Sequence, residues 1–233
     1  IESDIVLTSP LYAEITDKLV NASNVDSITA FISCVPCSDL KYNYTIYSLM
    51  GGVVKTGEKL MGSDSVYVTD LDVSGIPDGV IKLTVQLKDT LDQLIATTTT
   101  DYTKDVILPS AYYLQKNLQD LGTSNLDSLV IDVMTDEING EYELTITGDS
   151  IVGGSSIISM EDAIDNTFNS TQETVRASRV IRGKVTDIKQ SIPIMNLNNF
   201  ADGLIKFELV VTDSALNVGS EIFKDSIYKQ TNS

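Results

Sequence analysis

The sequence contains no histidine and no tryptophan, and its 233 residues include only two cysteines. Without imidazole there is no Ser-His-Asp or Cys-His nucleophile pair, no His-ligated zinc and no side chain whose unperturbed pKa lies near neutrality. Most hydrolase mechanisms are therefore excluded. A carboxylate pair can hydrolyse glycosides without histidine, but the acidic residues are scattered through predicted turns. We expect a protein that is not an enzyme.

Positive charge is also scarce, since 16 Lys and Arg are set against 33 Asp and Glu, for a formal net charge of -17. The net negative charge repels phosphate backbones and anionic lipids, so we expect neither nucleic-acid binding nor direct membrane insertion. No apolar run approaches the roughly 20 residues that span a bilayer, and the chain starts at Ile1 without a leader-like segment. We expect a soluble chain, with any export signal or anchor outside it.

What the sequence does contain is a period-two apolar pattern in short blocks, separated by clusters of Gly, Asn, Asp and Ser. Such alternation is typical of half-buried strands. It predicts an all-β fold built from sandwiches of two antiparallel sheets. The residues expected to face inward in two of these blocks are Ile28, Ala30, Ile32 and Cys34, and Ile81, Leu83, Val85 and Leu87.

The order of these blocks occurs twice. IPDGVIKLTVQLKD at 76–89 returns as FADGLIKFELVVTD at 200–213, an offset of 124 positions (203 minus 79). ASNVDSI at 22–28 returns as TSNLDSL at 123–129, an offset of 101 positions (123 minus 22). The offset rises from 101 to 124 positions along the chain, which indicates an insertion in the second copy near 155–178. We expect this insertion to form a short helix or a long crossover loop over a sheet edge.

The repeat predicts two tandem domains, residues 1–107 and residues 108–233. A Lys-Asp pair is expected to close the last strand of each copy, at 104–105 and again at 224–225. The connector between the copies is short and contains Pro109, which leaves few residues for a flexible hinge. We therefore expect the two copies to form a rod.

The repeated segment, DG-x-I-K-[LF]-x-[VL]-x-[LV]-x-D, resembles the end of the bacterial immunoglobulin-like repeats that occur in tandem in surface adhesins. The usual family pattern is D-G-x-Y-x-L-x-V-x-x-x-D-x-x-G-N. Here Ile81 and Ile205 stand in place of the Tyr, and the Gly before the Asn is missing, since Asp92 precedes Gln93 and Leu216 precedes Asn217.

The resemblance implies two immunoglobulin-like β-sandwiches and no catalysis. It implies a structural or adhesive segment, a spacer or stalk, of an exported bacterial cell-surface protein, hence an extracellular location. The expected partners are neighbouring repeats of the same chain and a surface protein or glycan ligand. The alternatives are a carbohydrate-binding accessory module, which a concave sheet face lined with aromatic rings would favour, and a structural component of a virion or appendage.

Calcium is the one cofactor that the acidic composition suggests. Asp101 and Asp105 lie near the junction of the two copies and are the candidate ligands, because calcium sites gather six to eight oxygen atoms. There is no EF-hand spacing, and a solvated acidic surface is the alternative.

Cys34 and Cys37 form the motif CVPC. They are the only cysteines and there is no histidine, so neither a thioredoxin-like site nor a zinc site is expected. A short-loop disulfide and two reduced thiols both fit. A disulfide across the sandwich is excluded, because the facing strand around 81–87 contains no cysteine.

Overall fold

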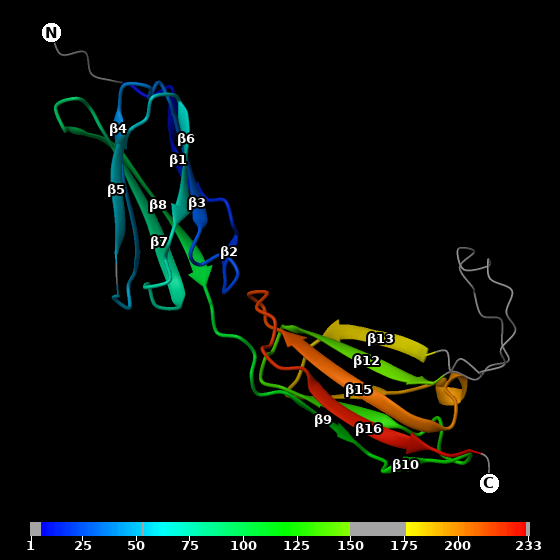
Figure 1. The fold of residues 1–233 in the computed structure, drawn as a ribbon. Helices are drawn as coiled ribbons and strands as arrows, with labels where there is room; N and C mark the ends of the chain where they lie inside the picture. Colours follow the sequence, from blue (N-terminus) through cyan, green and yellow to red (C-terminus); the bar gives the residue numbers. More distant parts are fainter. Residues whose placement is uncertain (1–5, 53, 150–175, 232–233) are drawn as a thin grey trace, which may run out of the picture. The chain divides into compact units, whose positions relative to one another are not determined.

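The computed structural model describes residues 6–52, 54–149 and 176–231. The chain divides into two compact units, Ile1–Leu108 with Ala215–Asn217, and Pro109–Ser214 with Val218–Ser233 (Figure 1). Each unit has its own hydrophobic core between two sheets, so the prediction of two all-β sandwiches is confirmed. Within the described ranges the one helix is the single 3-10 turn η1 (Leu197–Asn199), and no helix there could cross a membrane.

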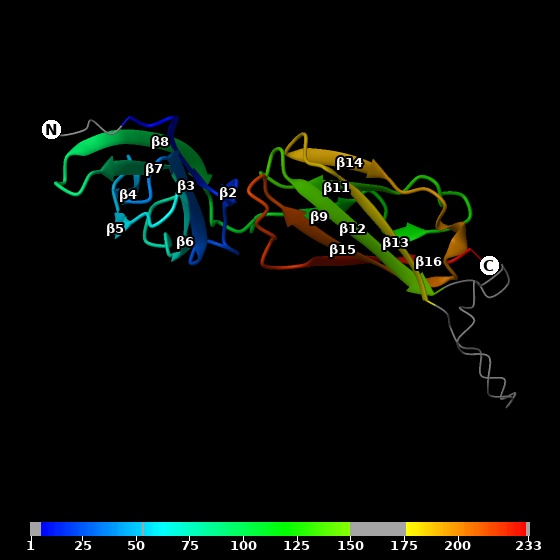
Figure 2. The same cartoon turned by 90° about the horizontal axis from the view of Figure 1, so that it is seen from above.

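The first sandwich pairs a three-stranded sheet, in the order β1-β3-β6, with a five-stranded sheet, in the order β2-β8-β7-β4-β5 (Figure 2). Its neighbouring strands are antiparallel except for β2, which runs parallel to β8. The strands are β1 (Ser9–Ile15), β2 (Leu19–Val20), β3 (Ile28–Val35), β4 (Lys41–Ser48), β5 (Lys55–Leu60), β6 (Ser65–Leu71), β7 (Gly79–Lys88) and β8 (Leu94–Lys104).

The second sandwich repeats this topology. Its sheets have the orders β9-β11-β14 and β10-β16-β15-β12-β13, which become those of the first sandwich when each strand is matched with the one eight places earlier. Again the short strand, β10, runs parallel to the last strand, β16. The strands are β9 (Tyr113–Lys116), β10 (Asp120–Leu121), β11 (Val130–Met134), β12 (Glu141–Asp149), β13 (Arg176–Lys184), β14 (Lys189–Pro193), β15 (Gly203–Thr212) and β16 (Phe223–Lys229).

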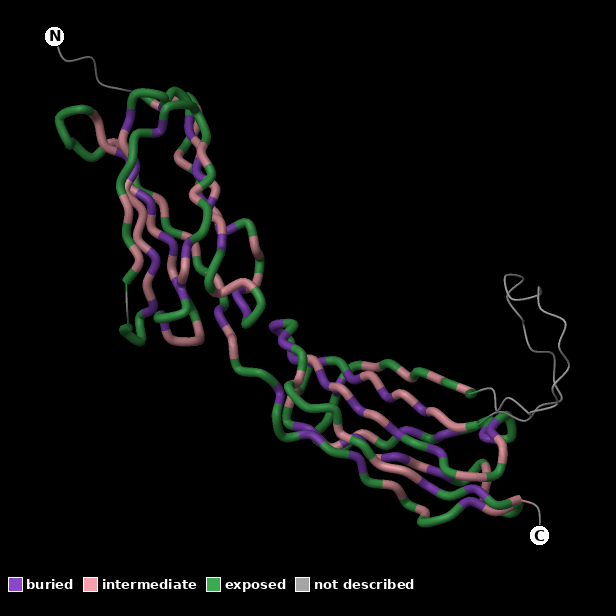
Figure 3. The backbone as a smooth tube through the Cα atoms, in the orientation of Figure 1, coloured by how far each residue is buried: buried purple, intermediate pink, exposed green. Residues whose placement is uncertain are grey.

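The inward faces predicted from the alternation are confirmed. The four residues predicted to face inward on β7 are fully buried, and those on β3 are at most 1% exposed. Figure 3 shows buried positions alternating with more exposed ones along these strands. Ile81 and Ile205, which replace the Tyr of the resembled family, are 0% and 1% exposed, so each aliphatic side chain fills the core of its own sandwich.

Glycines within two edge strands are explained by tyrosine rings. Gly57 on β5 pairs with Tyr44 on β4, and Gly183 on β13 pairs with Tyr142 on β12. A Cβ atom added to Gly57 would lie 2.3 Å from the Tyr44 ring, and one added to Gly183 would lie 2.5 Å from the Tyr142 hydroxyl. Both distances are shorter than a Cβ atom's contacts with its neighbours. The ring occupies the space that a side chain would fill, which accounts for glycine inside a strand.

The predicted equivalence of the Lys-Asp pairs at 104–105 and 224–225 is wrong. Gly79 pairs in register with Lys104, and Gly203 pairs in register with Lys229. Lys229 is therefore the counterpart of Lys104, whereas the Lys-Asp pair at 224–225 lies near the start of β16. Most of the predicted insertion, residues 155–175, lies outside the described residues. Residues 176–178 are the first three residues of β13.

The repeated Asp-Gly turn ties the start of one strand to the end of the next. Asp78 Oδ1 accepts a hydrogen bond of 2.7 Å from Lys104 Nζ, and Asp78 Oδ2 accepts one of 3.3 Å from the Val106 N–H. The Lys104 side chain is only 2% exposed. We call these contacts, and those of Asp202 in the second sandwich, the Asp-Gly clasp.

In the second sandwich the clasp has different donors. Asp202 accepts hydrogen bonds from the Thr231 N–H at 3.0 Å and from the Thr231 hydroxyl at 2.7 Å. Lys229, which is also 2% exposed, donates to the Phe200 carbonyl at 2.5 Å. The carboxylate therefore holds the segment that follows the last strand in both copies.

The repeated asparagine has the same role in both copies. Asn24 Oδ1 accepts from the Asn21 N–H at 2.9 Å, and Asn24 Nδ2 donates to the Leu19 carbonyl at 3.0 Å. Asn125 bonds to the Gly122 N–H and the Asp120 carbonyl in the same way, at 2.7 and 3.2 Å. The shared SNxDS motif thus shapes the loop after the short parallel strand.

We predict that Asp78→Ala destabilises the first sandwich by about 3 to 5 kcal/mol, because it leaves the buried Lys104 ammonium without its carboxylate. The matched control is Asp101→Ala, which removes the partner of the more exposed Lys82 and is expected to cost less than about 1 kcal/mol. Calorimetric unfolding of the two variants measures the difference. Equal losses would show that the clasp contributes no more than a surface ion pair.

Candidate functional site

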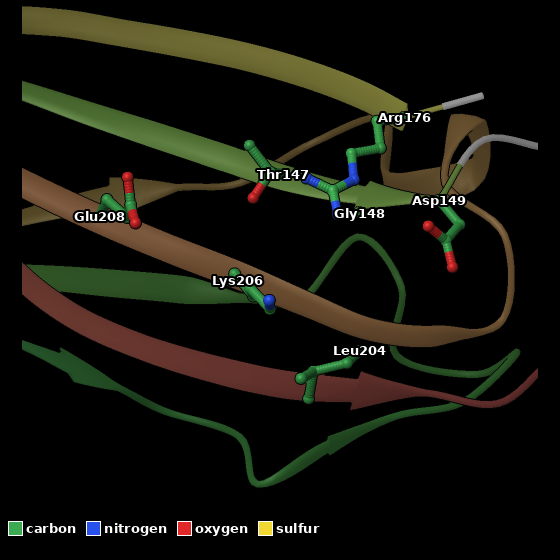
Figure 4. A pocket seen from close by; sticks show the side chains of 7 residues that line it. All are labelled: Thr147, Gly148, Asp149, Arg176, Leu204, Lys206 and Glu208. Carbon is green, nitrogen blue, oxygen red and sulfur yellow. The ribbon is translucent and has the colours of Figure 1, made fainter. Parts of the chain in front are cut away.

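A hollow lies on the outer face of the five-stranded sheet of the second sandwich. Its volume is about 480 Å³, and side chains from β12, β13 and β15 surround it (Figure 4). A second hollow, of about 340 Å³, shares Leu204, Lys206 and Glu208 with it and extends over β16 to Lys224. The residues that line the first are Thr147, Gly148, Asp149, Arg176, Leu204, Lys206 and Glu208.

The two carboxylates of this hollow lie too far apart for glycoside hydrolysis. Figure 4 shows Asp149 and Glu208 at its opposite ends. Glu208 pairs in register with Thr145, four residues from Asp149 on β12, and four residues of strand span about 13 Å. Glycosidases place their two carboxylates roughly 5 to 9.5 Å apart. Glu208 also lies 3.3 Å from Lys224 Nζ, which balances its charge.

All three arginines of the sequence lie on β13, which is an edge strand. Arg182 forms an ion pair of 2.7 Å with Glu143, and Arg179 donates to the Met195 carbonyl at 2.5 Å. Arg176 lines the hollow described above. The net charge of the whole chain conceals this local positive charge, although the run RASRVIRGK displays it at three-residue spacing.

The two calcium candidates sit on the first sandwich with different partners. Both carboxylate oxygens of Asp101, on β8, accept from Lys82 Nζ at 2.7 and 2.8 Å. Asp105 Oδ1 accepts from the Ile107 N–H at 3.0 Å. No group of three or more His, Cys, Asp or Glu suited to a metal ion occurs among the residues whose structure is described. Calcium binding at Asp101 and Asp105 stays a prediction.

Cys34 and Cys37 are joined by a disulfide in the structure, with their Cα atoms 5.7 Å apart. Both are 1% exposed and belong to the core of the first sandwich. Asp64 holds the turn from the neighbouring segment, since its carbonyl accepts from the Cys34 N–H at 3.0 Å and its carboxylate from the Cys37 N–H at 2.9 Å. The bridge tightens the turn that leaves β3 and does not connect the two sheets.

No protein-family model matches the sequence, and no characterised protein is similar enough in sequence to count as a relative. Solved structures with a similar fold include a tetra-tandem repeat from the extending region of a large adhesion protein, at 14% identity and a TM-score of 0.37. That match covers 95% of this chain and 50% of the other. A structure described as a Ca²⁺-stabilized adhesin of an Antarctic bacterium matches at 11% identity and a TM-score of 0.47, over 98% of this chain and 51% of the other.

A two-domain fibronectin type-III segment of chicken tenascin also matches, at 12% identity and a TM-score of 0.35, over 94% of this chain and 99% of the other. The chain thus spans about half the length of these two adhesin structures. The two adhesin structures are of the class that the sequence resemblance names. At these identities and scores the matches assign neither a family nor a function to this chain.

We predict that reduction of the disulfide lowers the melting temperature of the first sandwich alone. Opening a loop of this size removes about 2 kcal/mol of stability, which corresponds to a shift on the order of 10 °C for a domain of about 100 residues. Calorimetry with and without reductant measures it, and the second sandwich, which has no cysteine, is the control within the same chain. A shift of both transitions, or of neither, would contradict the prediction.

Proposed function

We propose that the chain is a non-catalytic spacer segment of an exported bacterial cell-surface protein, whose immunoglobulin-like repeats carry tension along the polypeptide. The observation that carries this proposal is the direction of one short strand in each sandwich. β2 runs parallel to β8, and β10 runs parallel to β16. In each copy a strand near the point where the chain enters the sandwich therefore lies beside the strand by which it leaves.

Parallel neighbours that are pulled from opposite ends slide past each other, so their hydrogen bonds are loaded together. A hairpin pulled at its open end breaks its bonds one at a time. In the first sandwich the ladder pairs Leu19 with Thr103 and Val20 with Lys104, and the Asp105 N–H extends it to the Val20 carbonyl at 2.9 Å. The Asp-Gly clasp binds the same end of β8 from its other side.

The second sandwich has the same arrangement. Asp120 pairs with Tyr228 and Leu121 with Lys229, and the Gln230 N–H donates to the Leu121 carbonyl at 2.8 Å. The residues that the two repeats share lie beside these parallel pairs: the Asp-Gly turn, and the SNxDS loop that contains Asn24 or Asn125. The disulfide supports export, because such bonds persist in oxidising compartments. The partners proposed for this segment are further repeats of the same chain, and a surface protein or glycan.

We predict that pulling the full chain by its ends gives two separate unfolding events in single-molecule force spectroscopy. Each should release at most about 33 to 36 nm per 100 residues unfolded, because an extended chain spans at most about 3.3 to 3.6 Å per residue. A spacer requires both events to occur at forces well above the noise of the instrument. A single event, or unfolding without measurable resistance, would contradict the proposal.

A matched pair of variants tests the parallel ladder directly. Gln230→Pro removes the N–H that bonds to Leu121, whereas Gln230→Ala keeps it. We expect the proline variant to lower the unfolding force of one event and leave the other unchanged, and the alanine variant to resemble the original chain. The same force in both variants would show that this ladder does not carry the load.

The calcium prediction has a separate test. If Asp101 and Asp105 contribute to a site near the end of the first sandwich, calcium should raise the melting temperature of that sandwich, and Asp105→Ala should abolish the rise. Such a site would need further oxygen ligands from carbonyl groups or water, because calcium binds six to eight oxygen atoms. An unchanged melting curve in the presence of chelator would remove the prediction.

A further inference from the structure

Three aromatic rings form a row on the outer face of the three-stranded sheet of the first sandwich. Each strand supplies one ring: Tyr12 on β1, Phe31 on β3 and Tyr67 on β6. The ring centroids lie 6.4 Å apart for Tyr12 and Phe31, and 4.9 Å apart for Phe31 and Tyr67. Tyr12 is 50% exposed and Tyr67 is 63% exposed. We call these three residues the aromatic row.

The aromatic row does not belong to the core of the sandwich. Its neighbours in sequence on β3, Ala30 and Ile32, are fully buried, and alternation therefore turns Phe31 to the opposite face. Cross-strand aromatic pairs stabilise a sheet by about 0.2 to 1 kcal/mol each. Stabilisation of the sheet is therefore the competing explanation for the row.

The second sandwich shows that the fold does not require this row. By strand register, the counterparts of Phe31 and Tyr67 are Asp132 and Ser191, which pair with each other as the two aromatic residues do. Lys189 forms an ion pair with Asp132 at 2.8 Å and Ser191 donates to it at 2.6 Å, contacts that hold the pKa of Asp132 below its usual range. Polar residues thus fill two of the three positions in the same topology, and Tyr113 keeps a ring at the position of Tyr12.

The side chains beside the rings are hydroxyls and one carboxylate. Register places Tyr12 beside Ser33, and Ser33 beside Ser65, across the three strands. In the adjacent row, Glu14 lies beside Phe31. The six positions therefore combine three rings with two serine hydroxyls and one acid, and none of them is basic.

Tyr12 and Glu14 are linked, since the Tyr12 hydroxyl donates to Glu14 Oε2 at 2.7 Å. This hydrogen bond, together with burial and the nearby negative charge, raises the pKa of the Tyr12 phenol. The single phenol proton is held by Glu14, and the phenol oxygen can accept a hydrogen bond from a ligand hydroxyl. The carboxylate has a second oxygen that can accept from a ligand hydroxyl.

This combination suits a ligand with apolar C–H faces and many hydroxyl groups but no charge. An anionic ligand would meet a carboxylate without a cation to offset it. A stable protein interface buries about 800 Å² per partner. An aromatic side chain offers about 150 to 250 Å² in total, so three partly buried rings provide less area than a protein partner would need. A neutral sugar has the required chemistry, because its C–H face stacks on a ring while its hydroxyls bond to polar side chains.

We propose that the outer face of β1, β3 and β6 binds a short neutral oligosaccharide. Tyr12, Phe31 and Tyr67 stack against the sugar rings. Glu14, Ser33 and Ser65 bond to the sugar hydroxyls. This site adds a ligand to the spacer role and does not depend on that role, because a sandwich can carry tension without it.

The test is an array of neutral glycans probed with the full chain, followed by calorimetric titration of the strongest hit. Tyr67→Ala should weaken binding about tenfold or more, equivalent to roughly 1.4 kcal/mol, and Tyr67→Phe should keep most of the affinity. The matched control is Tyr113→Ala, which removes the counterpart of Tyr12 from the second sandwich and should bind as the original chain does. Melting curves confirm that each variant is folded.

The proposal is supported if binding is retained at high salt and weakened about tenfold or more in Tyr67→Ala. It is overturned if no neutral glycan binds, or if only anionic glycans bind. It is also overturned if Tyr67→Ala and Tyr113→Ala weaken binding equally, because the site would then lie elsewhere. Tyr12→Ala gives an independent check from the other end of the row, with the same expected loss.

Discussion

The carboxylate of the Asp-Gly turn is the polar contact that holds the end of the last strand in each sandwich. In the first sandwich it holds a lysine that is 2% exposed, and a buried ammonium without an acceptor is strongly destabilising. The contact lies where β7 begins and β8 ends, and β8 carries β2 on its other edge. One side chain therefore fixes the corner at which the antiparallel part of the sheet meets its parallel strand.

The second sandwich keeps the carboxylate and changes its donors. Asp202 accepts from both the backbone and the hydroxyl of Thr231, and Lys229 turns its ammonium to the Phe200 carbonyl. In both copies a charged acceptor at the turn bonds to donors at or just after the end of the last strand. A sequence motif of two residues can therefore recur while its partners differ.

Much of the fold could be predicted because it depends on local periodicity. The inward faces around Ile81 and Ile205 follow from alternation alone, and the Asp-Gly turn marks where both strands begin. Lateral neighbours could not be predicted, because Tyr12, Phe31 and Tyr67 meet only through strand order. For the same reason the sequence gives no sign that Lys82 faces Asp101. The two Lys-Asp pairs were wrongly matched because a short sequence motif does not show whether it lies at the start or at the end of a strand.

One difference between the copies bears on how neighbouring repeats fold during synthesis. Lys116 on β9 forms an ion pair of 2.7 Å with Asp225 on β16, and its side chain is 16% exposed. The counterpart of Asp225 on β8 is Thr100, whose hydroxyl instead donates to the Ala13 carbonyl at 2.9 Å. A β8 segment that took the place of β16 would leave this lysine without its carboxylate. Such mismatches oppose strand exchange between successive domains, a characteristic route to misassembly in tandem arrays.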